Sequence, residues 1–207
     1  ADTLVICANV PTSNTEGLDG IERITGVRPT FVQADCTDIE ALRKLFQDNP
    51  GIKGIIHFAA SKAVGESVQK PLLYYRNNLL SLINLLTLMP EFGVEGIVFS
   101  SSCTVYGQPD VLPVDETAPI KPALSPYGNT KQISEEIIKD TIHANAPFKS
   151  IILRYFNPIG AHPSAQIGEL PHAVPHTPIP NLPQPAHALL HTLSALPRDA
   201  PPPPRPL

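Results

Sequence analysis

The sequence predicts an α/β fold built on a doubly wound parallel sheet. Up to about residue 160, short and nearly continuous apolar runs alternate with longer stretches of helical periodicity. Apolar runs of this kind are typical of parallel strands that helices cover on both faces. We expect strands at residues 4–7, 30–33, 54–59, 96–100 and 150–155.

Helix signals lie between these runs. Thr37 and Glu40 have the spacing of a capping box ahead of an amphipathic stretch, which predicts a helix start. Residues 71–89 predict a long apolar helix that ends at Pro90, because proline cannot donate a backbone hydrogen bond. Ser125, which is followed by a proline, is expected to cap a further helix.

The composition changes after Leu170. Twelve of the 25 prolines fall within residues 171–207, where proline excludes regular strands and only residues 186–196 could form a short helix. We therefore expect a folded domain at residues 1–170 and an irregular, proline-rich tail at residues 171–207.

Composition and charge exclude several classes of protein. The net charge of −4 leaves no basic stripe for nucleic acid. Cys7, Cys36 and Cys103 are odd in number and sit in apolar settings, which favours free thiols in a reducing compartment. The sequence shows neither a signal peptide nor an apolar helix long enough to cross a bilayer. We expect a cytoplasmic protein that binds neither nucleic acid nor membrane.

Tyr127 and Lys131 carry the most informative chemistry. Four residues apart on a helix, they share one face, and a nearby ammonium can lower the pKa of a phenol by up to roughly three units. Such a pair also occurs by chance on helix surfaces. The strand at residues 96–100, however, runs directly into Ser101 and Ser102, and hydroxyls at a strand's carboxyl end line the ligand crevice of such sheets.

Five segments resemble signature segments of the UDP-glucose 4-epimerases, which belong to the extended short-chain dehydrogenase/reductase superfamily. The resemblance covers roughly residues 3–171. The segments are HFAASKAVGESVQKP (57–71), YYRNN (74–78), FSSSCTVYGQ (99–108), LSPYGNTK (124–131) and RYFNPIGAHP (154–163).

The resemblance implies a Rossmann-like domain at residues 1–170 that binds NAD. It also implies that the substrate is a UDP-hexose, that the protein forms a homodimer, and that it acts in galactose metabolism. Ser102, Tyr127 and Lys131 would be catalytic, with the Tyr127 phenolate taking a proton from the sugar's 4-hydroxyl while hydride passes to NAD. Cofactor contacts would come from Asn9, Asp35, Cys36, Phe58, Ala59, Lys62, Asn77, Ser102, Tyr127, Lys131 and Phe156, and substrate contacts from Lys62, Ser102, Tyr127 and Asn157.

The sequence also departs from the family. The first strand and its Gly-x-x-Gly-x-x-Gly turn are missing, and Ala8 stands where an acidic residue usually binds the adenosine ribose. Two strands would then lack a neighbour. We expect the 207 residues alone to bind NAD weakly and to show no epimerase activity.

Two alternatives stay open. One is another sugar-nucleotide dehydratase or decarboxylase of the same superfamily, although Cys103 after Ser102 favours the epimerase over a dehydratase, which needs an acidic pair there. The other is a catalytically dead, dimerising remnant. We expect no metal site, because the histidine pairs at residues 172/176 and 187/191 lie among prolines without a carboxylate or cysteine.

Overall fold

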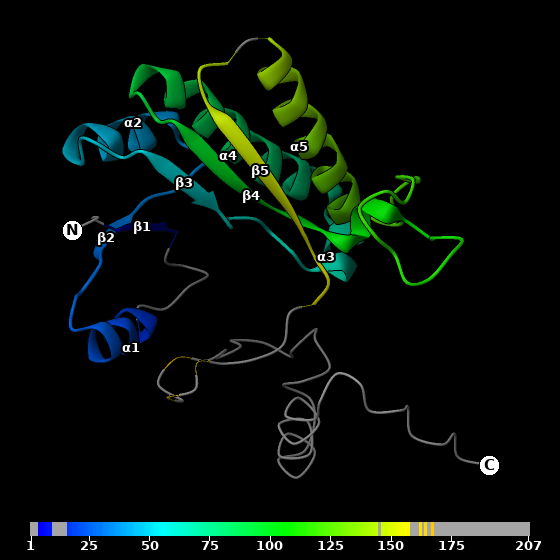
Figure 1. The fold of residues 1–207 in the computed structure, drawn as a ribbon, viewed down its shortest axis with the longest axis horizontal. Coiled ribbons are helices and arrows are strands. Elements are labelled where there is room, and N and C mark those ends of the chain that lie inside the picture. The colour runs from blue at the N-terminus through cyan, green and yellow to red at the C-terminus, as the bar shows by residue number, and fades with distance from the viewer. Residues whose placement is uncertain are drawn as a thin grey trace. The chain divides into compact units, whose positions relative to one another are not determined.

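The computed structural model describes residues 4–9, 16–144, 146–157, 162, 164 and 167. Within them, parallel strands occur at the expected places, which confirms the α/β prediction (Figure 1). The predicted tail, its short helix and its histidine pairs lie outside the described residues, and the boundary at residue 170 stays a prediction. The strands are β1 (Val5–Ala8), β2 (Thr30–Gln33), β3 (Gly54–His57), β4 (Gly96–Ser102) and β5 (Lys149–Tyr155).

The strands form two separate sheets in the described part of the chain. β1 pairs with β2, and β3, β4 and β5 form a second sheet in that order. β1 and β3 thus each have one paired edge among the described residues. The expectation that two strands lack a neighbour agrees with this arrangement of the described strands.

Helices connect the strands. In chain order they are α1 (Glu16–Thr25), α2 (Ile39–Asp48), α3 (Val64–Gln69), α4 (Pro71–Glu91), the short 3₁₀ helix η2 (Cys103–Tyr106) and α5 (Pro126–His143). None of the helices in the described ranges is long and apolar enough to span a membrane.

Two details of the helix ends correct the sequence-based expectations. Asp38, not Thr37, caps α2, because its side chain accepts from the backbone N–H groups of Glu40 and Ala41. α4 does not stop at Pro90 but ends at Glu91, since a proline in the last turn removes only one helical hydrogen bond. The predicted cap of α5 is confirmed, with the Ser125 hydroxyl accepting from the backbone N–H of Gly128.

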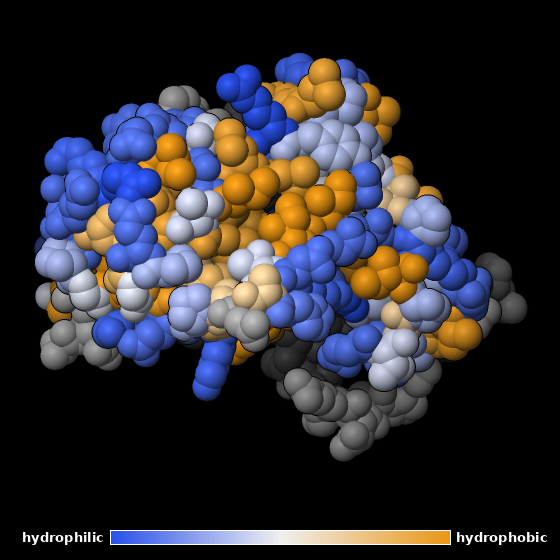
Figure 2. Space-filling view, turned by 90° about the horizontal axis from the view of Figure 1, so that it is seen from above, coloured by the Kyte–Doolittle hydropathy of each residue, from blue (hydrophilic) through white to orange (hydrophobic). Residues whose placement is uncertain are grey.

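One apolar core lies between the helices and the strands. α4 and α5 lie next to each other against the three-stranded sheet (Figure 1). Leu82, Leu88 and Ile138 are fully buried in this core, and Val32 of the two-stranded sheet packs against it. Other large apolar side chains stay exposed in the described part, and Figure 2 shows apolar residues gathered towards the middle of the face in view.

Candidate active site

Polar side chains gather where the strands of the larger sheet end. Because β3, β4 and β5 are parallel, their carboxyl ends lie along one edge. Ser102 ends β4 opposite Tyr155, the last residue of β5, while Phe58 and Ala59 follow β3. This edge is where doubly wound sheets bind their ligands.

Ser102 and Tyr127 meet at this edge. Ser102 is buried, and its hydroxyl accepts from the backbone N–H of Thr104 at 3.3 Å, which fixes the start of η2. Tyr127 lies in the first turn of α5, two residues after the Ser125 cap. Burial raises the pKa of Tyr127, and a hydrogen bond from Ser102 partly opposes that shift by stabilising the phenolate.

Lys131 lies one helical turn after Tyr127 and is buried, with only 4% of its surface exposed. Its ammonium donates to the carbonyl of Ser100 at 2.6 Å and lies 4.8 Å from the centroid of the Phe99 ring. Burial lowers the pKa of Lys131 to about 8, because the charged form loses its hydration.

The expectation that Lys131 brings the pKa of Tyr127 down towards neutrality is wrong for this structure. The ammonium is directed at the Ser100 carbonyl and lies 5.9 Å from the centroid of the Tyr127 ring. Burial therefore decides the direction of the pKa shift of Tyr127, and this pKa lies above its ordinary value. Sequence spacing places the two residues on one face but does not fix where the long lysine side chain points.

His57 is a neighbour of this group that the sequence reasoning missed. It ends β3, is buried, and its ring centroid lies 5.9 Å from that of Phe99. Burial, with a smaller contribution from the Lys131 charge, lowers the pKa of His57 to about 4, so the imidazole is neutral at physiological pH. In the sequence, its position at the end of a predicted strand was the one feature that could have identified it as a site residue.

Glu135 was also missed, although it holds α5 in place. Its carboxylate is 1% exposed and accepts two hydrogen bonds from Arg154 of β5, at 2.9 and 2.7 Å. The Ser101 hydroxyl of β4 donates to the same carboxylate at 2.6 Å. Burial would raise the pKa of Glu135, but the bonds from Arg154 and Ser101 outweigh burial, and the pKa is lowered. One side chain thus ties α5 to two strands.

A second set of hydrogen bonds joins the loop after β3 to α4 and α5. Asn78 accepts from the backbone N–H of Ser61 at 2.8 Å and donates to the Thr130 hydroxyl at 3.1 Å. The predicted cofactor residue Asn77 donates to the Ser61 hydroxyl at 3.1 Å. The loop that carries the exposed residue Lys62 is therefore anchored to the helix that carries Tyr127.

The remaining predicted residues divide between two places. Asn9, at the end of β1, donates to the carboxylate of Asp35 at 3.0 Å, and Cys36 follows Asp35. Phe58 and Phe156 follow β3 and β5 with 63% and 56% of their surfaces exposed, so their rings are available to a planar ligand. Asn157 is exposed as well. Acceptors and exposed rings are the kinds of group that bind the ribose hydroxyls and flat rings of a dinucleotide, and the described residues contain no glycine-rich turn for its phosphates.

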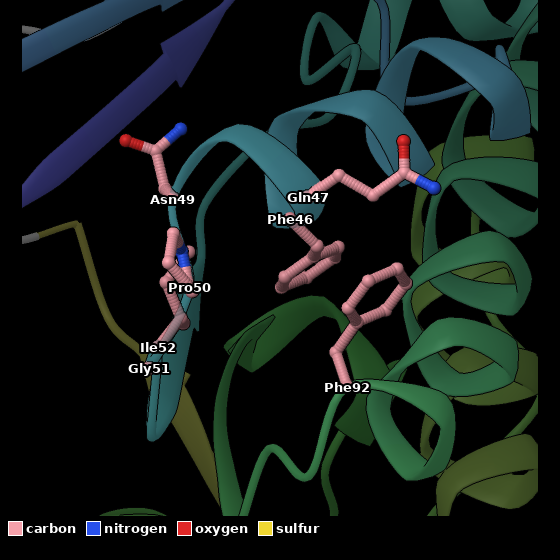
Figure 3. A pocket seen from close by; sticks show the side chains of 7 residues that line it. All are labelled: Phe46, Gln47, Asn49, Pro50, Gly51, Ile52 and Phe92. Carbon is pink, nitrogen blue, oxygen red and sulfur yellow. The ribbon is translucent and has the colours of Figure 1, made fainter.

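A separate pocket of about 250 Å³ lies at the other end of the strands. Figure 3 shows the rings of Phe46 and Phe92 next to each other, with residues 49–52 along the opposite side. The two rings are stacked with centroids 5.2 Å apart. Because no ionisable side chain lines this pocket, it offers nothing for proton transfer.

Comparisons with known proteins agree with this geometry. The model of the NAD dependent epimerase/dehydratase family matches residues 3–177. The UDP-glucose 4-epimerase of Bacillus subtilis is 44% identical over 198 residues, which are 96% of this chain and 58% of the relative. The mouse UDP-glucose 4-epimerase is 47% identical over 172 residues, which are 83% of this chain and 49% of the relative.

Solved structures give the same result. A UDP-glucose 4-epimerase from Bifidobacterium longum, solved in complex with NAD+ and UDP, superposes with a TM-score of 0.82 at 40% identity. The match covers 86% of this chain and 53% of that structure. The chain thus spans about half the length of the curated relatives and structures that it matches.

Replacing Glu135 by Gln should destabilise the fold by about 3 kcal/mol at neutral pH, because Arg154 then loses its buried counter-charge. The pKa of Glu135 is lower in the folded than in the unfolded chain, so its contribution to stability is complete above the unfolded value and is lost as the pH falls through the folded value. Urea unfolding at several pH values measures this difference.

The exposed neighbour Glu136 provides the control, since Glu136→Gln should change the free energy of unfolding by less than about 0.5 kcal/mol. An equal and pH-independent effect of both substitutions would contradict the role given to Glu135.

Proposed function

The chain belongs to the NAD dependent epimerase/dehydratase family, and from this premise we propose that it carries the reacting residues of a UDP-hexose 4-epimerase. In the full-length protein the reaction would interconvert UDP-glucose and UDP-galactose by transient oxidation at carbon 4 of the sugar, as part of galactose metabolism in the cytoplasm. The observation that carries the proposal is the convergence of Ser102, Tyr127 and Lys131 at the carboxyl edge of the sheet.

The described residues have defined tasks in this proposal. The Ser102 hydroxyl holds the oxygen on carbon 4, and the Tyr127 phenolate takes the proton of that hydroxyl. Bound NAD is the acceptor of the hydride. Ser102 lies at a strand end and Tyr127 at a capped helix end, so both groups are positioned by backbone hydrogen bonds before a substrate arrives.

Lys131 would stabilise the phenolate once the proton has left. Its ammonium is buried, so its attraction to a new negative charge is weakly screened. With a pKa of about 8 it is mostly protonated at neutral pH. Its bond to the Ser100 carbonyl holds the charge at the site when the phenol is neutral.

Asn9, Asp35 and Cys36 would hold the adenosine end of NAD, while Phe58, Ala59 and Phe156 would lie towards its nicotinamide end. Asn77 would fix the connecting loop through Ser61. Lys62 and Asn157 would reach the nucleotide sugar. The support is that Asn9, Phe58 and Phe156 all follow the carboxyl ends of parallel strands.

A full-length version of the protein should lose about 10²-fold or more in turnover when Tyr127 is replaced by Phe, because the proton then has no acceptor. The assay is the interconversion of UDP-glucose and UDP-galactose. Tyr75→Phe is the matched control: this phenol accepts from the Asn129 amide at 2.6 Å, and its loss should leave turnover largely unchanged.

Near-normal turnover of the Tyr127→Phe protein would refute the catalytic assignment. The 207 residues alone serve as a second control, and we expect them to be inactive because they contain no glycine-rich turn for the NAD phosphates.

We also propose that α4 and α5 form a two-fold interface between copies of the chain. Leu72, Leu73 and Ile83 of α4 are exposed by 81%, 50% and 43%, and exposed apolar side chains on a well-packed helix favour contact with a second copy of the chain.

Light scattering should show a dimer at tens of micromolar chain, and the double substitution of Leu72 and Ile83 by Glu should give a monomer. The substitution Val111→Glu, at an exposed loop residue, should leave the dimer intact. A strictly monomeric unmodified chain would exclude the interface.

A further inference from the structure

The Lys131 ammonium is a buried charge without a counter-ion in the described part of the chain. The residue is almost fully buried, and none of the ion pairs among the described residues includes it. A buried charge is costly unless neighbouring groups stabilise it. One such group is the Ser100 carbonyl, which accepts from the ammonium at 2.6 Å. Because an ammonium has three donors, this single bond leaves much of the charge to be stabilised by other groups.

The titratable neighbours of this ammonium do not supply that stabilisation. The Glu135 carboxylate, one turn further along α5, is bound to Arg154 of β5, which is itself a cation. Burial, with a smaller contribution from the ammonium, lowers the pKa of His57 to about 4, so its imidazole is neutral. Burial also raises the pKa of Tyr127, which keeps this phenol neutral. Cys103 of η2 carries a thiol, and a thiol is a weak acceptor.

The ring of Phe99 lies where a stabilising group is needed. Its centroid is 4.8 Å from the ammonium nitrogen of Lys131, whereas the centroid of the Tyr127 ring is 5.9 Å away. The face of an aromatic ring attracts a cation within about 6 Å, and the attraction is strongest when both partners are removed from water. Phe99 is 2% exposed and Lys131 is 4% exposed, so this condition is met.

The sheet fixes the position of this ring. Phe99 lies in β4, the middle strand of the larger sheet, and pairs in register with His57 of β3 and Ile152 of β5. The His57 ring lies beside it, with centroids 5.9 Å apart and planes inclined by 32°. Phe99 also belongs to the apolar core. In a close-packed core, the ring could move away from the ammonium only if the middle of the sheet were disturbed.

We propose that Phe99 is a positioning residue of the candidate site, and that its ring holds the Lys131 ammonium in the charged form through a cation–π contact. The Ser100 carbonyl fixes the place of the ammonium, and the Phe99 ring stabilises the charge there. Phe99 and Ser100 are consecutive residues, so β4 alone supplies both supports of this cation. The use of the charge at Tyr127 rests on the proposed function, whereas the contact itself does not.

Titration of Lys131 in the 207-residue chain tests the contact. NMR of isotope-labelled lysine follows the carbon next to each ammonium as the pH changes, and the Lys131 signal is the one that disappears in Lys131→Met. Trifluorophenylalanine in place of Phe99 nearly keeps the shape of the ring but withdraws electrons from its face. The pKa of Lys131 should then fall from about 8 to about 7, because the charged form loses this attraction.

Phe148→Leu is the matched control for Phe99→Leu. Phe148 is buried in the same core, but it precedes β5 and takes part in none of the cation–π contacts of the described residues. Phe99→Leu should lower the pKa of Lys131, and Phe148→Leu should leave it unchanged. Circular dichroism confirms that each chain is folded. The fluorinated chain decides, because an unchanged pKa there would overturn the proposal and assign any effect of Phe99→Leu to altered packing.

This result is independent of the catalytic assignment. A lowered pKa of Lys131 in the fluorinated chain, together with near-normal turnover of the full-length Tyr127→Phe protein, would support the contact and refute the proposed function. An unchanged pKa of Lys131, together with lost turnover of Tyr127→Phe, would refute the contact and support the proposed function.

Discussion

The buried carboxylate of Glu135 is the constraint on which the candidate site depends. It accepts two hydrogen bonds from Arg154 of β5 and one from Ser101 of β4, so α5 is fixed to both strands by a single residue. Tyr127 and Lys131 lie two turns and one turn earlier on the same helix. Because a buried charge is tolerated only when it is paired and hydrogen-bonded, any shift of α5 would leave Glu135 or Arg154 unsatisfied. The position of the phenol relative to Ser102 is therefore set by an ion pair that takes no part in the proposed chemistry.

Burial has opposite consequences for the paired and the unpaired groups around this helix. Glu135 keeps its charge because Arg154 and Ser101 stabilise it. At Tyr127, Lys131 and His57 burial prevails and shifts each of their pKa values towards the neutral form, with Lys131 at about 8 and His57 at about 4. The hydrogen bond from Ser102 opposes the shift of Tyr127 only in part. The site thus holds a neutral phenol beside a lysine that is mostly protonated at neutral pH. Because a raised pKa disfavours the phenolate, the proposed proton transfer depends on the groups that oppose burial, among them the hydrogen bond from Ser102.

Local patterns allowed much of the fold and site to be predicted. The apolar runs located all the described strands, and the spacing of Tyr127 and Lys131 after a strand-end serine identified the residues that the structure brings together. What the sequence did not reveal depends on contacts between distant residues. Glu135 and Arg154 are 19 positions apart, and nothing local marks them as partners. The direction of the Tyr127 pKa shift depends on how deeply packing buries the phenol and where Lys131 points, and neither follows from helical spacing.

Titration of the Tyr127 phenol shows whether Ser102 and Tyr127 act as the single proton-transfer unit that we propose. The absorbance of the chain minus that of its Tyr127→Phe variant isolates this tyrosine from the other four. We expect a pKa above the ordinary value of about 10, and a further increase when Ser102 is replaced by Ala, because the hydrogen bond that favours the phenolate is removed. A pKa of Tyr127 that is unchanged or lowered by Ser102→Ala would show that the two hydroxyls are not coupled in this way.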